Sequence, residues 1–403
     1  MHHFLRHATT PLLLAITLLS HTSTQATNHA TNQATNQATN HATTQVTNPA
    51  TSRLTQQATR SVDLVLALDV SSSMSGLIDS AKQRLWDVVN EFNQAQPQPD
   101  LRVALISYGN PHYGKGGGYV RIDQALTRDL DAVNQALFGF KTNGGDEYVA
   151  RVITRASNEL QWSAQRDALR VLFIAGNESA TQDPQFDLHQ AINVAREKDI
   201  IVNTIFCGKD GHGGVPTSWR TVAQHAGGVY ASIDQQQSAV ANVVAPQDKQ
   251  LRELNAKLNN TYVPFGHTGE QRRENQRRQD SNAVTMSEQA MAARAVTKAS
   301  KMYRSADWDL VDAVEAGVKL KEVDAKTLPA PMRDMNEQER TTYVKQKAEQ
   351  RRSLRAKIQQ LGSARADHLA AERARTAPSE TRGFSAAMKQ GLRAIAEKKG
   401  FTF

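Results

Sequence analysis

Residues 61–76 read SVDLVLALDVSSSMSG, and the fold that we expect follows from this stretch. Val62 to Leu68 is a nearly continuous apolar run, interrupted only by Asp63. Such a run is typical of a strand that is buried on both faces of a parallel sheet. Asp69 stands where the run ends, and an amphipathic segment follows Gly76. A strand, a polar loop and a helix in this order predict the first unit of an open α/β sheet.

The loop after this strand carries oxygen-bearing side chains at alternate positions. Ser71 and Ser73 follow Asp69, so that one carboxylate and two hydroxyls are expected at the carboxyl edge of the sheet. Open α/β sheets bind their ligands at that edge, and Mg²⁺ prefers a few hard oxygen ligands together with retained water. The alternative is that the aspartate and serines only cap the next helix, which these residue types do well.

A strand followed by Asp-x-Ser-x-Ser and a helix resembles the metal-ion-dependent adhesion site of von Willebrand factor A domains. The resemblance implies two further metal loops. The second falls at Gly144-Gly145-Asp146, where an aspartate replaces the usual threonine, although a helix N-cap would also account for it. The third falls at residues 176–178, where an amide stands in the place of an aspartate and a following glutamate restores charge through a bound water. The metal residues implied for Mg²⁺ or Mn²⁺ are therefore Asp69, Ser71, Ser73, Asp146, Asn177 and Glu178.

Strands alternate with helical segments from Ser61 to about Val244. This alternation predicts an α/β fold, a doubly wound and mostly parallel sheet flanked by helices, as residues 61–244. A basic, mainly α-helical extension is expected over 245–403, and its charge of +10 against −2 for the rest of the chain gives the net charge of +8. Its helices are predicted at 249–258, 287–303, 309–320 and 336–361. Phrases such as SWRTVAQHAGGVYASID and LNNTYVPFG resemble an exported bacterial group of von Willebrand A proteins with a long helical C-terminal extension.

The beginning of the chain predicts export. Residues 1–26 have a weakly basic start, an apolar core that is too short to span a bilayer, and a small residue at the end, as in a cleaved signal peptide. The repeats of ATNH and ATNQ that follow predict a disordered spacer over 27–60. We therefore expect a periplasmic or secreted protein that is soluble and is not a lipoprotein. Cys207 is the only cysteine, which excludes a disulfide within the chain and favours a buried side chain.

The leading functional hypothesis is a binding protein and not an enzyme. Within the resembled family, an acidic side chain of a protein partner completes the coordination of the metal. A metal-assisted hydrolase is the first alternative, with His112 or His225 as a base, but HExxH and GxSxG motifs are absent from the sequence. His212 is expected in solvent, since no histidine or cysteine lies at ligand spacing. A structural fold with a vestigial metal site is the second alternative.

The basic extension leaves two further partners to consider. A basic amphipathic helix can contact anionic lipid or nucleic acid, although a solvated helical face is the commoner explanation. Export and the lack of aromatic residues among the arginines argue against nucleic acid. We therefore expect no nucleic-acid partner, and we keep contact with a membrane surface as a minor alternative.

Overall fold

The computed structural model describes residues 59–211, 213–233, 243–375 and 383–403. The signal peptide expected over 1–26 and nearly all of the spacer expected over 27–60 lie outside these residues, as does His212. In the described residues, no helix combines the length and the apolar character needed to cross a membrane.

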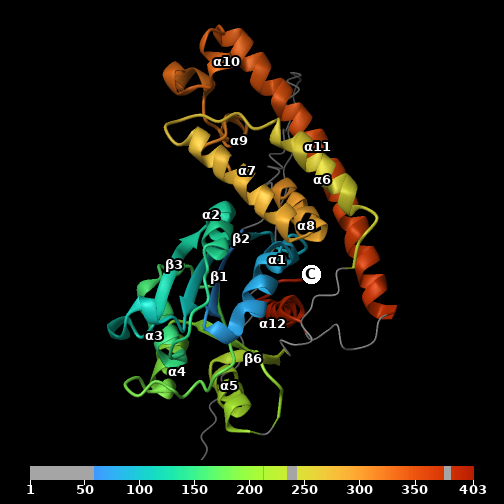
Figure 1. The fold of residues 1–403 in the computed structure, drawn as a ribbon. Helices are drawn as coiled ribbons and strands as arrows, with labels where there is room; N and C mark the ends of the chain where they lie inside the picture. Colours follow the sequence, from blue (N-terminus) through green and yellow to red (C-terminus); the bar gives the residue numbers. More distant parts are fainter. Residues whose placement is uncertain (1–58, 212, 234–242, 376–382) are drawn as a thin grey trace, which may run out of the picture. The chain divides into compact units, whose positions relative to one another are not determined.

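A single sheet of six strands is the centre of the described structure (Figure 1). The strands follow the order β3-β2-β1-β4-β5-β6, and all neighbours pair in parallel except β3, which lies antiparallel at one edge. This arrangement confirms the predicted α/β fold with a mostly parallel sheet. The strands are β1 (Arg60–Asp69), β2 (Pro99–Tyr108), β3 (Val120–Thr127), β4 (Leu169–Gly176), β5 (Ile200–Phe206) and β6 (Gly227–Ser232).

Strand β1 lies in the middle of the sheet, between β2 and β4. Its side chains alternate: Leu64 and Leu66 belong to one hydrophobic cluster, and Val65 belongs to the cluster on the opposite face. This explains why the sequence of the strand is apolar at almost every position. The exception, Asp63, is fully buried and accepts two hydrogen bonds of 2.8 Å from the guanidinium of Arg102.

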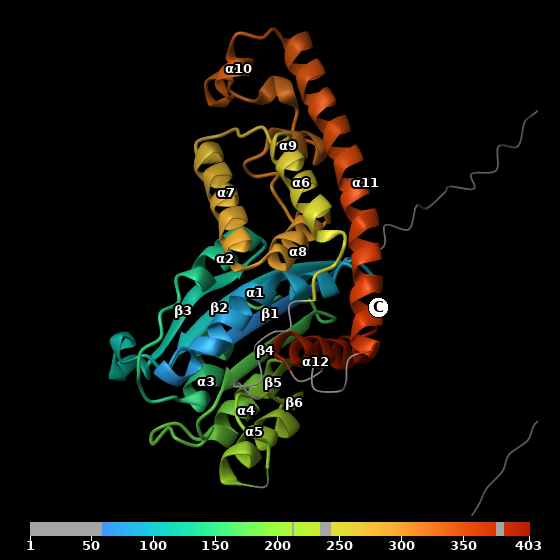
Figure 2. The same cartoon turned by 45° about the vertical axis from the view of Figure 1, so that its right-hand side comes forward.

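Helices cover both faces of the sheet (Figure 2). The helices α1 (Ser75–Glu91), α2 (Leu130–Phe138) and α12 (Phe384–Lys398) share a cluster with one face, and α3 (Val149–Glu159), α4 (Leu188–Glu197) and α5 (Gly214–His225) share a cluster with the other. The arrangement is therefore three-layered, with the sheet in the middle, and the carboxyl ends of the five parallel strands meet at one edge.

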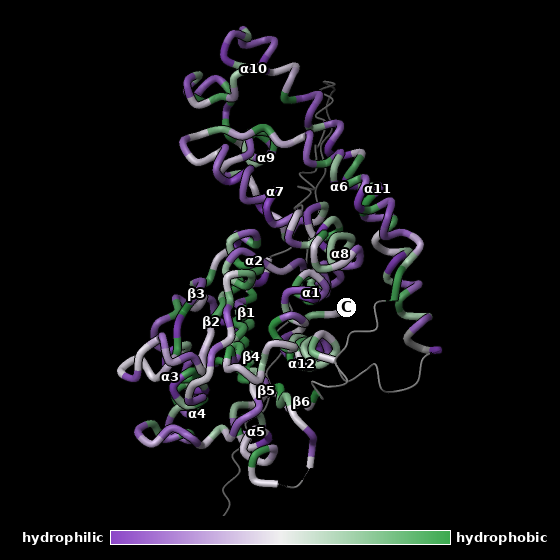
Figure 3. The backbone as a smooth tube through the Cα atoms, viewed as in Figure 1, coloured by the Kyte–Doolittle hydropathy of each residue, from purple (hydrophilic) through white to green (hydrophobic). Residues whose placement is uncertain are grey.

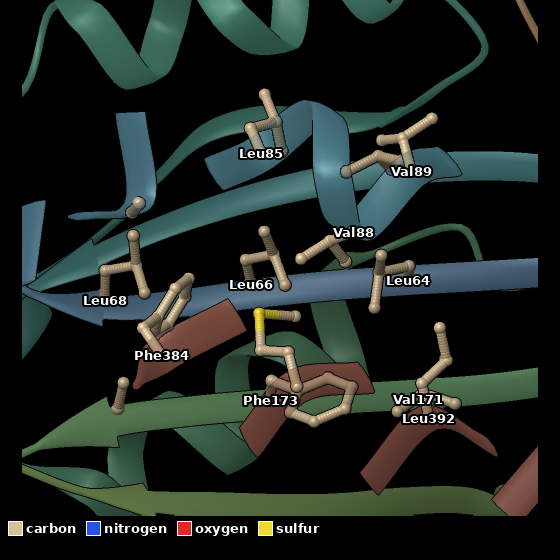
Figure 4. Packing of buried hydrophobic residues seen from close by; sticks show 14 of the residues in the cluster. Leu64, Leu66, Leu68, Leu85, Val88, Val89, Val171, Phe173, Phe384 and Leu392 are labelled. Atoms are coloured by element: carbon tan, nitrogen blue, oxygen red, sulfur yellow. The ribbon is translucent and has the colours of Figure 1, made fainter. Parts of the chain in front are cut away.

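Helix α12 comes from the end of the chain and yet completes the core of the sheet. Phe384 and Leu392 are buried in the same cluster as Leu66 and Phe173 (Figure 4). Thr402, beyond the helix, forms an antiparallel bridge with Gln96. The predicted boundary at residue 244 separates the strands from the helical part, but residues 383–403 return to the sheet.

The remaining helices form a region between β6 and α12. Four of them lie near predicted positions: α6 (Asp248–Asn259), α8 (Glu288–Ala299), α9 (Leu310–Glu315) and α11 (Glu337–Arg375). Two others, α7 (Gly269–Met286) and the short α10 (Ala330–Arg333), have no counterpart in the predicted set. Figure 3 shows that α7 is hydrophilic along most of its length. Its sequence therefore has no apolar stripe from which a helix could be predicted. Short 3₁₀ helices are η1 (Ser72–Met74), η2 (Pro111–Tyr113), η3 (Lys115–Gly117), η4 (Leu320–Glu322) and η5 (Ala325–Thr327).

Buried charged side chains join this helical region to the sheet domain. Arg294 of α8 is fully buried and binds Asp131 of α2 at 2.8 Å and Asp280 of α7 at 2.5 Å. Lys298 of α8 is fully buried as well and binds Asp280 at 3.0 Å. Buried ions are stable only when they are paired and hydrogen bonded, so these pairs give the contact a specific geometry, beside the apolar packing of Ala293 and Met302 on the sheet cluster.

Candidate metal centre

Asp69 is the last residue of β1, and its side chain is fully buried at the carboxyl edge of the sheet. Its Oδ1 accepts a hydrogen bond of 2.7 Å from the backbone N–H of Ser71, which closes the turn that leaves the strand. Its Oδ2 is buried and has no hydrogen-bond partner among the described residues. Burying a carboxylate oxygen without a partner is costly, so this atom indicates a ligand.

The two predicted serines lie together in the loop that leads into α1. The hydroxyl oxygens of Ser71 and Ser73 are 3.1 Å apart. The amide Nδ2 of Asn177, which follows β4, donates a hydrogen bond of 2.9 Å to Ser73 Oγ. The Oδ1 of the same amide is buried and has no partner among the described residues. The structure therefore brings together the first and third predicted loops.

Glu147 is the acidic residue that the structure places beside Asp69, and the predicted set does not contain it. Its side chain is 4% exposed, and its Oε2 is a third buried oxygen without a partner in the described chain. Asp146, the predicted ligand, is exposed and accepts a hydrogen bond of 3.0 Å from the Tyr148 hydroxyl. Because the two residues are adjacent in sequence, only their orientation in the loop distinguishes them.

Glycines allow the three loops to approach one another. Gly109, at the end of β2, has a φ of +79°, and a Cβ atom there would meet Asp69 Oδ1 at 2.8 Å and Glu147 Cγ at 3.1 Å. A Cβ atom on Gly145 would meet the carbonyl oxygen of Gly109 at 2.8 Å. A side chain at Gly109 would fill the space next to the carboxyl pair, and one at Gly145 would push its loop away from Gly109 and Pro111.

Without a bound cation, burial determines the direction in which the pKa values of Asp69 and Glu147 shift. Burial raises the pKa of Asp69 well above its ordinary value, and the adjacent Glu147 carboxyl raises this pKa further. Burial likewise raises the pKa of Glu147. Cys207, which is buried as predicted, also has a raised pKa because of its burial and the two carboxyls. A positive ion bound between the carboxyls would reverse this effect, since it favours their charged forms.

The other predicted residues lie at the periphery. Glu178 is exposed, and its carboxylate accepts a hydrogen bond from Gln182 at 3.0 Å. His112 Nδ1 lies 3.1 Å from Asn110 Oδ1 and 2.9 Å from Asn143 Nδ2, so it donates to the first or accepts from the second according to its tautomer. The ring of His225 packs against that of another histidine on α4. In the described chain, no group of three or more His, Cys, Asp or Glu side chains is arranged to hold a metal. The site thus rests on two carboxyls supplemented by neutral oxygens.

The chain thus has a doubly wound sheet, an Asp-x-Ser-x-Ser loop after the central strand, and two further loops that meet this loop. Residues 63–262 match the von Willebrand factor type A domain. The resemblance inferred from the sequence is confirmed for this domain, which we call the VWA domain below. No curated protein matches the chain.

Several solved structures are similar to the chain in fold. Proximal thread matrix protein 1 from the mussel byssus, with a zinc-occupied MIDAS motif, aligns with a TM-score of 0.35 and 13% identity over 44% of this chain and 43% of that chain. The pilus adhesin SpaC from Lactobacillus rhamnosus GG aligns with a TM-score of 0.35 and 16% identity over 44% and 28%. The SpRpn10 VWA domain aligns with a TM-score of 0.34 and 13% identity over 47% and 100%. The alignments span less than half the length of the byssus and pilus proteins, and the likeness concerns the fold alone.

The residues of the VWA domain fit a divalent cation. The three unpartnered oxygens, Asp69 Oδ2, Glu147 Oε2 and Asn177 Oδ1, are all hard donors, and the hydroxyls of Ser71 and Ser73 are too. Such oxygen sets suit Mg²⁺ or Mn²⁺ better than softer metals, which prefer sulfur or imidazole. The only cysteine in this area donates its thiol to the carbonyl of Ile205 at 3.5 Å.

Proposed function

We propose that the VWA domain holds Mg²⁺ or Mn²⁺ at the end of β1 and uses it to capture a protein partner through an acidic side chain. The observation that carries the proposal is the set of three buried, unpartnered oxygens on three different loops next to two serine hydroxyls. A buried polar atom normally has a partner in the protein, a water molecule or an ion, so three such oxygens that converge beside two hydroxyls support a shared bound cation.

In this proposal the residues around the cation have different roles. Asp69 and Glu147 supply the negative charge, and the serine hydroxyls and the Asn177 amide supply neutral oxygens. Asp146 and Glu178 are exposed, so they act through water molecules or on the incoming partner. Ser73 is exposed, so a carboxylate of the partner can approach from its side and complete the coordination of the ion, as the resemblance to the family implies.

The proposal extends to the place where the protein works. The leader-like residues at the start of the sequence predict a periplasmic or secreted protein, where Mg²⁺ and partner proteins are both accessible. We propose a binding function and no catalysis. The two histidines considered as bases, His112 and His225, contact other side chains instead of the carboxyl pair.

Titration calorimetry with Mg²⁺ and Mn²⁺ tests the cation site. The adjacent residues 146 and 147 provide a matched pair: Glu147→Gln removes the buried charge, and Asp146→Asn removes an exposed one. We expect Glu147→Gln to weaken binding by about tenfold or more, which is about 1.4 kcal/mol. Asp146→Asn is expected to change affinity less than about threefold. Absence of metal binding in the wild type would favour the structural alternative, and equal losses in the two variants would contradict our assignment of residue 147.

A variant at the third loop separates a working site from a vestigial one. Asn177→Asp places a full charge where the amide oxygen lies, so it should tighten Mg²⁺ binding if that residue faces the ion.

The partner itself is tested by retention from a periplasmic extract on the immobilised protein, with Mg²⁺ and with chelator. Retention that is equal in chelator, or equal on an Asp69→Asn column, would exclude capture through the cation.

A further inference from the structure

A lysine, an asparagine and an aspartate meet in the helical region, on helices that the proposed cation site does not use. Lys298 of α8 is fully buried, and its Nζ lies 2.5 Å from Oδ1 of Asn259, the last residue of α6. The same amine lies 3.0 Å from Oδ2 of Asp280 on α7. Asp280 Oδ2 also accepts a hydrogen bond of 2.7 Å from Asn259 Nδ2. Each of the three side chains therefore contacts the other two.

The amine of Lys298 lies next to the carbonyl carbon of the Asn259 side-chain amide. This carbon, Cγ, is bonded to Oδ1 at a length of about 1.2 Å, so that Nζ is at most about 3.7 Å from it. Reacting atoms that are positioned for attack lie about 3–3.5 Å apart. A movement of a few tenths of an ångström is therefore enough to bring the amine within reach of the carbon.

The environment of Lys298 favours the neutral amine, which is the nucleophilic form of lysine. Burial lowers the pKa of this amine to about 8, although the carboxylate of Asp280 acts in the opposite direction. At pH 7 about one chain in ten then carries a neutral Lys298, compared with less than about one in a thousand for an exposed lysine. The buried amine is thus available for reaction at neutral pH.

Asp280 is placed to transfer a proton between the two reacting groups. Its Oδ2 contacts both the attacking Nζ of Lys298 and the Nδ2 of Asn259. Its Oδ1 accepts a hydrogen bond of 2.5 Å from Arg294 Nε, which orients the carboxylate. Burial opposes the charge of Asp280, but Lys298 and Arg294 outweigh this effect and lower its pKa. The carboxylate is therefore ionised at neutral pH and can accept a proton.

We infer that Lys298 and Asn259 form an isopeptide bond within the chain, with Asp280 as the catalytic residue. The lone pair of Nζ attacks Asn259 Cγ, and Asp280 Oδ2 takes one proton from the amine and delivers it to Nδ2. The bond between Cγ and Nδ2 then breaks, and the nitrogen leaves as ammonia. One amine and one amide give a new amide and one ammonia, so the reaction needs no oxidant and no other reactant.

The bond ties the end of α6 to α8 and closes a loop that contains α7. A covalent link between distant residues restricts the unfolded chain, as a disulfide does. This chain has one cysteine and cannot form a disulfide within itself, so the isopeptide bond takes that role. Until the bond forms, Lys298 keeps a free amine. The pH dependence of stability that this amine confers is therefore a property of protein that has not lost ammonia.

Mass spectrometry of the full chain, denatured and reduced, tests the inference. We expect a tryptic product in which residues 258–272 are joined to residues 295–301, because trypsin does not cleave after an acylated lysine. Its mass should be lower than that of the two separate peptides together by one ammonia, about 17 Da. If the protein contains only the separate peptides after incubation at pH 8, the inference is wrong. A joined product that has lost water and links Lys298 to Asp280 would also overturn it.

Two adjacent asparagines provide a matched pair of variants. Asn259→Ala removes the reacting amide and should abolish the joined product. Asn260→Ala changes the next residue, which is exposed, and should leave the product intact. A joined product that persists in Asn259→Ala, or that disappears in Asn260→Ala, contradicts the assignment of residue 259. The reacting residues are remote in sequence from the cation site, so this result does not depend on Mg²⁺ and leaves the proposed function to its own test.

The role of Asp280 is tested by two variants that differ in charge. Asp280→Asn keeps the shape of the side chain but cannot accept the proton, and it should reduce the joined fraction at least about tenfold. Asp280→Glu keeps a carboxylate and should restore part of this fraction. An unchanged fraction in Asp280→Asn, or an equal loss in the two variants, would show that Asp280 is only a structural partner of Lys298.

Discussion

The carboxyl pair at the end of β1 is the residue-scale feature with the largest consequence for stability. Burial raises the pKa of both Asp69 and Glu147 in the folded protein without metal. A carboxyl whose folded pKa exceeds its unfolded value stabilises the fold while it is protonated, and this contribution is lost as the pH rises through the folded pKa. At neutral pH and in the absence of a cation, the pair therefore opposes folding.

Asp69→Asn should consequently stabilise the protein in chelator. The asparagine oxygen can keep the hydrogen bond from Ser71, and its Nδ2 can donate to Glu147. We expect a higher melting temperature than that of the wild type in chelator at pH 7, a smaller loss of stability between pH 4 and pH 7, and no response to Mg²⁺. Asp79→Asn, an exposed change on α1, is the control. A lower melting temperature for Asp69→Asn in chelator would show that the pair is not under electrostatic strain.

Gly109→Ala should damage the site with little effect elsewhere. The added methyl group would meet Asp69 Oδ1 at 2.8 Å, and the φ of +79° is unfavourable for alanine. We expect a loss of about 1–3 kcal/mol in the free energy of unfolding and weaker Mg²⁺ binding. Denaturant unfolding and calorimetry measure the two effects. Gly76→Ala, where a Cβ atom would meet nothing within 4 Å, serves as the comparison.

The sequence predicted part of this site for a clear reason. Asp69 stands where a continuous apolar run ends and Ser71 and Ser73 come directly after it, so the end of the run placed all three at the end of the strand. Residues 146 and 147 are both acidic and adjacent. Glu147 lies against Gly109, which is distant in sequence, and the Tyr148 hydroxyl donates to Asp146. These contacts decide which residue is buried, and the sequence alone does not show them. The acidic pair indicated the right loop, but a single sequence does not show which member faces inward.

At the scale of the element, α12 behaves as a helix of the VWA domain. We expect a chain that ends at residue 375 to lose cooperative unfolding, because the face of the sheet that holds Phe173 would be open to water. A synthetic peptide of residues 383–403, added in excess, should restore the melting transition in a concentration-dependent way. A truncated chain with an unchanged melting temperature would show that α12 is only an appendage.

Helix α8 carries a buried lysine with an unusual titration. Burial lowers the pKa of Lys298 to about 8, whereas its ordinary value is about 10.4. A depressed folded pKa means that this group favours the folded state more as the pH rises through the interval between the two values.

Lys298→Met should remove this dependence. Relative to the methionine variant, the wild type should gain stability between pH 8 and pH 10, by up to about 3 kcal/mol. Denaturant unfolding of both proteins at several pH values measures the difference, in which all other titrating groups cancel. Lys301→Met, a change at an exposed lysine beyond the end of α8, is the control. A difference between the wild type and Lys298→Met that does not vary with pH would contradict the low pKa.

The helices show what periodicity can and cannot indicate. Apolar residues recur at helical intervals in α6 and α8, and both were predicted. The helix α7 buries Gln276, Gln279 and Asp280, so its inner face is polar and its pattern does not distinguish it from a loop. The helix α12 was not among the predicted helices, and nothing in the sequence indicates that it returns to a sheet whose last strand ended at Ser232.

At the scale of the whole described molecule, the helical region and the VWA domain are connected by the buried Asp131–Arg294 ion pair. Asp131→Asn leaves the guanidinium without one of its carboxylates, and we expect a loss of about 3–5 kcal/mol in the free energy of unfolding. Glu349→Gln removes a partner from an ion pair that is about 70% exposed on both sides, and it should cost less than about 0.5 kcal/mol. Similar losses for the two variants would mean that the junction contributes little.

The sequence did not predict how the helical region and the VWA domain are joined. The strands and the helices of the first part were predictable because each has its own periodicity. The partners that join distant parts were not, since Asp131 and Arg294 are charged residues that a sequence alone would assign to the surface.

The return of α12 to the sheet also bears on how the protein is made. A ribosome synthesises all six strands first, then the helical region, and only then the segment that covers Phe173. Until residues 383–403 emerge, α1 and α2 cover only part of that face, and the apolar surface around Phe173 is exposed to aggregation. The VWA domain therefore cannot complete its folding strand by strand during translation, and its maturation waits for the last part of the chain.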